Sequence, residues 1–353
     1  MTSLYITSVE DAGKTALCAG IGKKLQGRGI KVGFMVPFVT SSGDAADGGL
    51  EDAAFMQEIL GLKESTKLLC PFALSRSELW QGLTEGAPGL LQRLKQVYRK
   101  IARSKDIVIM EGLGNLDRDK ISALACYTVA DFLEAKVIIA LCYSPGLEPQ
   151  KILQIGNRLG ERLLGVVVNL VPQSRMEMVR RDLAISFERA GIKVLGLLPD
   201  VRSLLGITVA ELARSLDGEI LTSLENTKEL IENIMLGAMT PDSGVDYFSR
   251  KSNKAVIVRG DRADMQLAAL QTVTKCLVLT GNISPLPVVI ARAKERNVPI
   301  IVTGLDAAAA IASIEAAWAR AHFRHVGKLE KFRELLDCHF DFKILYSELG
   351  LED

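Results

Sequence analysis

Residues 4–15 read LYITSVEDAGKT, which is a short apolar run, a turn and the start of a helix that continues through ALCAGIGKKL. Gly13, Lys14 and Thr15 form the second half of the phosphate-binding loop pattern, while Ser8 stands where the pattern has its first glycine. A strand, a turn and a helix in this order direct the amides at the helix start toward a phosphate. The stretch therefore predicts that residues 12–16 (Ala12, Gly13, Lys14, Thr15, Ala16) bind a nucleotide. The alternative is a helix start without a ligand.

Strand and helix patterns alternate through the rest of the first half. Apolar runs at 31–36, 106–110, 137–141, 163–169 and 194–198 predict strands, and helical spacing predicts helices at 87–103, 149–159 and 176–190. Strands that alternate with helices form right-handed crossovers and a parallel sheet covered on both faces. The sequence predicts an α/β fold of the P-loop type, with a mostly parallel sheet and helices on both of its faces.

Three polar or special residues follow predicted strands, at the edge where a parallel sheet binds ligands. Glu111 ends the strand at 106–110, so it is the candidate acid for a magnesium ion beside Thr15. Asn169 and Pro199 end later strands and could line a base pocket, although asparagine is also common in turns. Asp52, with Glu51, opens the next predicted helix, where an acid serves either as a cap or as a metal ligand.

The chain has 353 residues, which fits two domains of ordinary size. The regular alternation of predicted strands and helices is interrupted around residues 202–206. We therefore place a nucleotide-binding domain at 1–203 and a second domain at 206–353. Thr208 is expected to cap a helix at 209–216. Strands predicted at 254–258, 275–279 and 298–302, with helices between them, make the second part a smaller α/β domain with a helical C-terminal tail.

Two turns in the second domain gather glycines and charges where a strand leads into a helix. The residues concerned are Gly260, Asp261, Arg262, Asp264, Thr280 and Gly281. They could bind a ligand there. They could equally cap a helix and pair with one another.

The composition narrows the possible partners and location. Lys and Arg total 43 against 42 Asp and Glu, so no basic surface for nucleic acid is predicted. The apolar runs have the length of strands and not of membrane spans, so no membrane association is expected. The first predicted strand begins almost at Met1, which leaves no room for a signal peptide and predicts a cytoplasmic protein.

Several segments, taken together and in order, resemble a known pair of domains. In the first half they are residues 7–15, 31–37 (KVGFMVP), 106–112 (DIVIMEG), 165–169 (GVVVN) and 195–200 (LGLLPD), and in the second half 237–239 (GAM), 260–270 (GDRADMQLAAL), 277–281 (LVLTG) and 298–302 (VPIIV). The first group resembles dethiobiotin synthetases, and the second resembles the DRTGG domain. This pair is found ahead of the catalytic domain in some phosphotransacetylases.

The resemblance implies roles for individual residues. In dethiobiotin synthetases the positions of Lys14, Thr15, Asp52 and Glu111 hold ATP and Mg²⁺, and the position of Asn169 contacts adenine, with Pro199 close by. The family has a lysine that stabilises the phosphate and the carboxylated substrate, and here Val36 occupies its position before Pro37. Losing such a cation typically costs about a hundred- to a thousandfold in rate. If the chain has any turnover, Lys14 is its catalytic residue.

These expectations lead to a nucleotide-binding regulatory or sensor protein that uses ATP and Mg²⁺ with little or no turnover. The alternative is an ATP-dependent ligase or carboxylase of the dethiobiotin synthetase or cobyrinic acid a,c-diamide synthase type. A scaffold with an inactive loop is a third possibility. The acetyltransferase domain of phosphotransacetylases is expected to be absent, so the chain by itself does not transfer acetyl groups. We also expect a homodimer, and an enzyme of acyl-phosphate metabolism is a possible partner.

Overall fold

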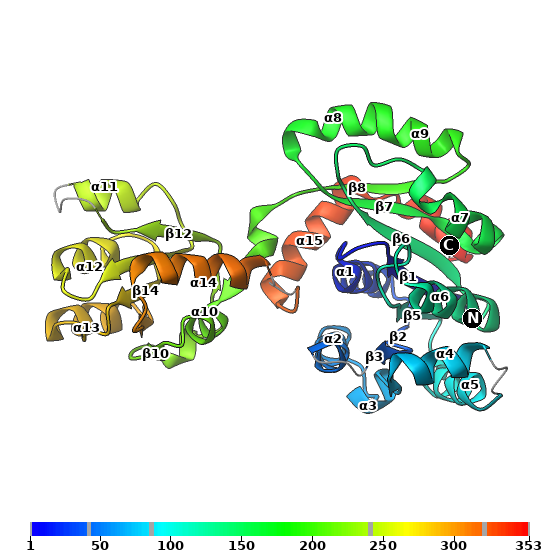
Figure 1. Cartoon of the computed structure of the whole chain (residues 1–353), viewed down its shortest axis with the longest axis horizontal. Coiled ribbons are helices and arrows are strands. Elements are labelled where there is room, and N and C mark those ends of the chain that lie inside the picture. Colours follow the sequence, from blue (N-terminus) through cyan, green and yellow to red (C-terminus); the bar gives the residue numbers. More distant parts are fainter. Residues whose placement is uncertain (1, 41–43, 85–87, 239–242, 320–322, 352–353) are drawn as a thin grey trace. The chain divides into compact units, whose positions relative to one another are not determined.

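The computed structural model describes residues 2–40, 44–84, 88–238, 243–319 and 323–351. The chain forms two compact units, Met1–Val201 together with Phe323–Asp353, and Arg202–His322 (Figure 1). The sequence assigned residues 323–353 to the second domain, whereas the structure places them in the first unit. Met239 of the GAM segment lies outside the described residues.

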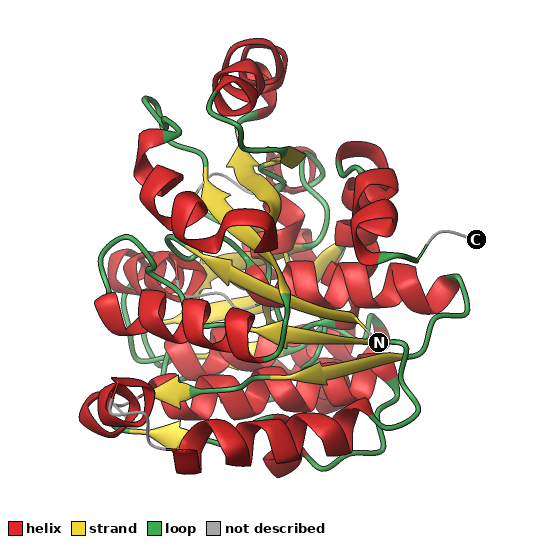
Figure 2. Cartoon of the chain, turned by 90° about the vertical axis from the view of Figure 1, so that its right-hand side faces the viewer, coloured by secondary structure: helices red, strands yellow, loops and turns green. Residues whose placement is uncertain are grey.

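The first unit is built on a six-stranded parallel sheet in the order β2-β5-β1-β6-β7-β8. Its strands are β1 (Thr2–Ser8), β2 (Val32–Met35), β5 (Ile107–Glu111), β6 (Lys136–Cys142), β7 (Leu163–Val171) and β8 (Val194–Pro199). The six strands predicted from the apolar runs are confirmed. Helices lie on both faces of the sheet (Figure 2), because parallel strands must be joined by crossovers that bury both faces.

The helices of the first unit are α1 (Lys14–Gly27), α2 (Asp44–Leu60), α3 (Thr66–Leu69), α4 (Arg76–Thr84), α5 (Pro88–Ala102), α6 (Lys120–Phe132), α7 (Gln150–Leu159), α8 (Met176–Met178), α9 (Ala184–Arg189), α15 (Val326–His339) and α16 (Phe342–Leu349). A π-helical turn (Val179–Leu183) separates α8 from α9, where the sequence predicted one continuous helix. Two short strands, β3 (Val39–Thr40) and β4 (Ala73–Leu74), pair beside α2. No helix within the described ranges has both the length and the apolar character needed to cross a bilayer.

The last two helices belong to the first unit because their apolar side chains are buried there. Leu329, Phe332 and Leu336 of α15 are each about 1% exposed, and α15 packs on α1 and β8. A side chain at Gly20 of α1 would begin 2.4 Å from the Cδ1 atom of Leu336, so glycine permits the close approach. This apolar face could not be assigned to a partner from sequence alone, since its partner lies some 300 residues earlier.

The second unit contains a five-stranded sheet in the order β10-β15-β14-β13-β12, which is parallel except for the edge strand β10. Its strands are β9 (Ile207–Thr208), β10 (Glu219–Ile220), β11 (Leu230–Ile231), β12 (Asn233–Leu236), β13 (Lys254–Arg259), β14 (Thr274–Thr280) and β15 (Ile300–Val302). Its helices are α10 (Val209–Ser215), α11 (Gly244–Phe248), α12 (Ala263–Leu270), α13 (Pro287–Glu295) and α14 (Ala307–Ala319). Thr208 caps α10 in a capping box with Glu211, as predicted.

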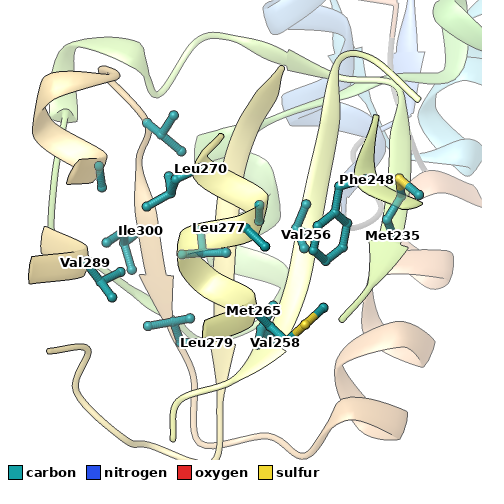
Figure 3. Close-up of a cluster of buried hydrophobic side chains, with 14 residues drawn as sticks. Met235, Phe248, Val256, Val258, Met265, Leu270, Leu277, Leu279, Val289 and Ile300 are labelled. Atoms are coloured by element: carbon teal, nitrogen blue, oxygen red, sulfur yellow. The ribbon is translucent and has the colours of Figure 1, made fainter. Parts of the chain in front are cut away.

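Both faces of the second sheet are buried, because successive residues of each strand alternate between two apolar clusters. Val256 and Val258 lie in one cluster with Phe248, Met265, Leu277 and Ile300 (Figure 3). Ala255 and Ile257 lie in the other cluster, with Val209, Cys276 and Ile314. The short strands β10 and β12 escaped prediction because their sequences are too brief to show a period.

A buried lysine opens β13 and makes the stability of the protein depend on pH. The Lys254 side chain is fully buried, its Nζ atom donates to the carbonyl of Val273 at 2.7 Å, and burial lowers its pKa to about 8. An unfolded lysine keeps its proton up to about pH 10.4. Between about pH 8 and 10 the unfolded state therefore binds more protons, and this lysine adds stability as pH rises.

We expect the wild type to gain stability relative to Lys254→Met between pH 7.5 and 9.5. The measurement is urea unfolding of both proteins at both pH values, so that other titrating groups cancel in the comparison. A difference between the two proteins that stays constant, or that shrinks as pH rises, would contradict the assignment of this buried ammonium group.

Candidate functional site

The site begins where β1 ends and α1 starts, at the carboxyl edge of the first sheet. Gly13 precedes α1 with φ of 80°, and no side chain caps the helix. The first amides of a helix have no acceptor within it, so they are available to a ligand. The loop is held by its neighbours, since Val9 N–H donates to the carbonyl of Ala140 at 3.2 Å and Asn169 Nδ2 donates to that of Ala12 at 3.1 Å.

Two features of position 13 require a glycine: its left-handed backbone conformation and the close approach of Asn169. A side chain there would begin 2.9 Å from Nδ2 of Asn169, in a left-handed conformation that costs other residues about 1–2 kcal/mol. We expect Gly13→Ala to lower the free energy of unfolding by at least about 1 kcal/mol. The matched control is Gly27→Ala, at the other end of α1, where nothing lies within 4 Å. Chemical denaturation of both variants is the measurement, and equal stability would contradict the strain at Gly13.

The Lys14 side chain folds back over the loop toward Ser8. Its Nζ atom donates to Oγ of Ser8 at 3.2 Å, and a side chain at Gly114 would begin 3.0 Å from the same nitrogen. Ser8 is buried. The residue that departs from the phosphate-loop pattern thus holds the loop lysine, and Gly114 leaves room for its ammonium group. Nothing in the sequence around Gly114 pointed to this role.

Glu111 and Thr15 meet at the centre of the site, as the sequence predicted from their places at the sheet edge. Thr15 Oγ1 donates to Oε1 of Glu111 at 2.8 Å, while Oε2 of Glu111 is buried with no hydrogen-bond partner. The pKa of Glu111 is raised to about 8, by burial first and then by the charge of Asp52, against the opposing effects of Lys14, the Thr15 hydroxyl and Arg324. An unpartnered buried carboxylate oxygen beside a hydroxyl is a donor set that suits Mg²⁺.

Asp52 lies in the middle of α2, not in its first turn. Residues 40–49 (TSSGDAADGG) have the composition of a loop, but the helix begins at Asp44. Gly49 allows α2 to approach β3, since a side chain there would begin 2.1 Å from Cγ1 of Val39. The capping role considered for Asp52 is therefore wrong.

The Asp52 carboxylate has a partner that sequence reasoning missed. Oδ1 of Asp52 accepts from Nε of Arg324 at 2.8 Å, across 272 positions of the chain. Arg324 follows no motif, so no sequence signal could have found the contact. Within the described residues, no group of three or more His, Cys, Asp and Glu side chains is arranged to bind a metal.

Asn169 and Pro199 lie at the carboxyl ends of β7 and β8, as predicted. Asn169 uses its amide within the protein, donating to Ala12 and accepting from the N–H of Leu170 at 2.9 Å. Pro199 is buried. Asn169 therefore supports the phosphate loop, and the predicted contacts of both residues with adenine stay predictions.

The charged turn of the second unit forms ion pairs between its own residues. Arg259 binds Asp261 at 2.7 Å and Arg262 binds Asp264 at 2.9 Å. Arg262 precedes α12 and its side chain does not cap the helix. The pairing that the sequence left open is present, and a ligand at this turn stays a prediction.

Glycines and a buried glutamine shape the same turn. Gly260 N–H donates to the carbonyl of Thr280 at 3.1 Å, and a side chain at Gly260 would begin 2.5 Å from Ile283. Gly281 has φ of +84°. Gln266, which the sequence analysis missed, is buried and donates to the carbonyls of Arg259 and Gly260, both at 3.0 Å.

Comparison with known protein families agrees with this geometry. A family model described as an AAA domain matches residues 2–208, which is more than half of the chain. The chain belongs to this AAA domain family. A second model, described as a DRTGG domain, matches residues 211–317. The AAA domain thus carries the phosphate loop, Glu111 and Asn169, and the DRTGG domain carries the charged turn after β13.

Named relatives match one or both domains. The chain is 25% identical over 207 residues to the ATP-dependent dethiobiotin synthetase BioD of Methanococcus vannielii, covering 56% of this chain and 93% of that protein. It is 23% identical over 308 residues to the phosphate acetyltransferase of Haemophilus influenzae, covering 79% of this chain and 42% of that enzyme. For the phosphate acetyltransferase of Acinetobacter baylyi, the values are 22% identity, 99% of this chain and 52% of that enzyme. The chain spans about half the length of the phosphate acetyltransferases that it matches.

Among solved structures, the CBS and DRTGG domains of a Clostridium perfringens pyrophosphatase, complexed with diadenosine tetraphosphate, match 43% of this chain and 74% of that one. The identity is 17% and the TM-score is 0.29. A likeness at this level carries no conclusion about function.

Proposed function

We propose that the chain is a regulatory or sensor protein that binds ATP with Mg²⁺ and turns it over little or not at all. The observation that carries this proposal is the pairing of Thr15 with Glu111 at 2.8 Å, below an uncapped helix start and beside Lys14. Together these groups supply amides, a cation and oxygen ligands, which are the parts that a Mg²⁺-nucleotide needs.

Each side chain has a defined part in the proposed binding. Thr15 and Glu111 would hold the magnesium ion, which neutralises phosphate charge when bound. The Lys14 ammonium group would exchange its contact with Ser8 for the phosphates, since a phosphate is a stronger acceptor than a hydroxyl. Because the pKa of Glu111 is about 8, this carboxyl must release its proton when a cation binds at neutral pH.

Val36 supports the proposal of low turnover. Its side chain is buried, at 5% exposure, and its N–H donates to the carbonyl of Leu69 at 2.7 Å. This apolar side chain occupies the position where dethiobiotin synthetases are expected to carry a lysine. Transition-state charge on a phosphoryl group would lack that cation.

A ligase or carboxylase that forms an activated carboxylate phosphate is the second candidate. The match to 93% of the length of a BioD protein favours it, because the whole of that synthetase corresponds to the AAA domain of this chain. A homodimer and an enzyme of acyl-phosphate metabolism as a partner are further proposals. Light scattering at micromolar concentration tests the dimer, which a clean monomer would exclude.

Calorimetric titration with ATP, with and without Mg²⁺, tests the binding, and a phosphate-release assay tests the turnover. We expect Mg²⁺-dependent binding and phosphate release far below one turnover per second. Release at several turnovers per second would overturn the regulatory proposal in favour of the ligase class. If the chain binds neither ATP nor any other nucleoside triphosphate, both the regulatory proposal and the ligase proposal are overturned.

A further inference from the structure

The guanidinium group of Arg324 binds two neighbouring acidic residues of α2, Glu51 and Asp52. Its Nε atom donates to Oδ1 of Asp52 at 2.8 Å, one terminal nitrogen donates to the carbonyl of Gly48 at 3.0 Å, and the other terminal nitrogen binds the carboxylate of Glu51. The side chains of Arg324 and Asp52 are 16% and 18% exposed. This pair is largely shielded from water, as is the pair between Lys105 and Glu64, and such pairs are weakened less by salt.

The neighbouring aromatic residue fixes this contact. The ring of Phe323 lies edge-on to Phe55 of α2, with centroids 6.2 Å apart, and edge-on to Phe332 of α15, with centroids 5.3 Å apart. Phe323 and Arg324 are the first residues of the chain after the second unit, which ends at residue 322. The point at which the chain re-enters the first unit is therefore held on α2 by an apolar contact and an ion pair together.

Asp52 lies on α2, which packs against α1, the helix that begins with Lys14 and Thr15. Its charge is, after burial, the strongest influence that raises the pKa of Glu111, and Lys14 and Arg324 act on the same carboxyl in the opposite direction. The charges of Lys14, Arg324 and Asp52 thus all act on Glu111. A divalent ion held by Thr15 and Glu111 would be drawn to the Asp52 carboxylate, which Arg324 already neutralises.

We propose that Arg324 is a resident cation of the nucleotide site, which competes with the divalent ion of a bound nucleotide for the carboxylate of Asp52. The proposal rests on the proposed function in that it concerns the same site. It makes Arg324 a positioning residue, since its hydrogen bonds go to Asp52, Glu51 and Gly48 of α2 and it acts on the ion through Asp52. The affinity for Mg²⁺ is then set by residue 324 as well as by Thr15 and Glu111.

The test is a calorimetric titration of Mg²⁺ into the full chain in the presence of saturating ATP. We expect Arg324→Gln to tighten the apparent Mg²⁺ affinity by about fivefold or more, the factor that corresponds to an ion pair of about 1 kcal/mol. ATP affinity without Mg²⁺ is expected to stay unchanged. Arg333→Gln is the matched control, because Arg333 is an exposed arginine of α15 that pairs with Glu330 within the helix.

The Asp52→Asn background separates competition from a structural effect. Arg324→Gln is expected to have no effect on Mg²⁺ affinity in that background, because the Asp52 carboxylate for which Arg324 and Mg²⁺ compete has been removed. An unchanged Mg²⁺ affinity in the single variant would overturn the proposal. So would weaker ATP binding without Mg²⁺, since it would make Arg324 a phosphate ligand. If Arg324→Gln does not fold, Arg324→Lys keeps the charge without the bidentate geometry, and a smaller shift in the same direction is expected.

Failure of the proposed function can be told apart from failure of this inference. If the wild type does not bind ATP, titration with Mn²⁺ alone, followed by electron paramagnetic resonance, still compares Arg324→Gln with the wild type. Tighter Mn²⁺ binding by Arg324→Gln would support the competition without a nucleotide, and equal binding would overturn it.

Discussion

Lys14→Ala is expected to weaken ATP binding by roughly 10- to 100-fold, because hydrogen bonds to charged groups contribute about 1.5–3 kcal/mol. Among the residues whose charge acts on Glu111, Arg324 is bound to Asp52 and cannot reach the phosphates without breaking that pair. The measurement is calorimetric titration of both proteins with ATP and Mg²⁺.

The control for this prediction is Lys120→Ala, which removes an exposed lysine from the first turn of α6. It changes the net charge of the protein by the same amount, so any loss of affinity from overall charge appears in both variants. Equal ATP affinity of the wild type and Lys14→Ala would falsify the placement of a nucleotide on this loop.

Leu277→Ala is expected to lower the free energy of unfolding by about 2–5 kcal/mol. Leu277 lies on β14, the central strand of the second sheet, is fully buried, and packs within the cluster that holds Phe248 and Ile300 (Figure 3). Close-packed interiors relax only in part around a lost side chain, so both transfer and cavity effects contribute. Urea unfolding of the full chain is the measurement.

Leu286→Ala is the matched control, since Leu286 precedes α13 and is 55% exposed. It removes the same atoms from a position where they are largely in contact with water, so little loss of stability is expected. A similar loss of unfolding free energy in both variants would mean that Leu277 does not pack in a core on its face of β14.

The parts of the fold that the sequence predicted are those whose signals are local. Each of the six strands of the first sheet is a continuous apolar run bounded by turn residues, so it could be recognised without knowing its neighbours. Thr15 and Glu111 were paired correctly because both follow strands of a parallel sheet, whose carboxyl ends share one edge. The topology of a parallel sheet thus predicted that these two residues are close, although they are 96 positions apart in the sequence.

The parts that could not be predicted depend on contacts between distant segments or on helices that overrule local composition. Arg324 sits in no motif, and only the folded chain brings it to Asp52. The glycines before Glu51 indicated a loop, yet packing against β3 keeps them within α2. The docking of α15 required knowledge that Gly20 leaves space for Leu336.

The return of Phe323–Asp353 to the first unit also sets an order of folding during synthesis. The DRTGG domain is continuous in the chain, so it can fold as soon as it leaves the ribosome, and domains generally fold as units. The first unit is complete only when α15 has been made, because until then the apolar surface of α1 around Gly20 is uncovered. The long insertion costs little in equilibrium stability, since loop-closure entropy grows only with the logarithm of length. The domain that is translated first is therefore the one completed last.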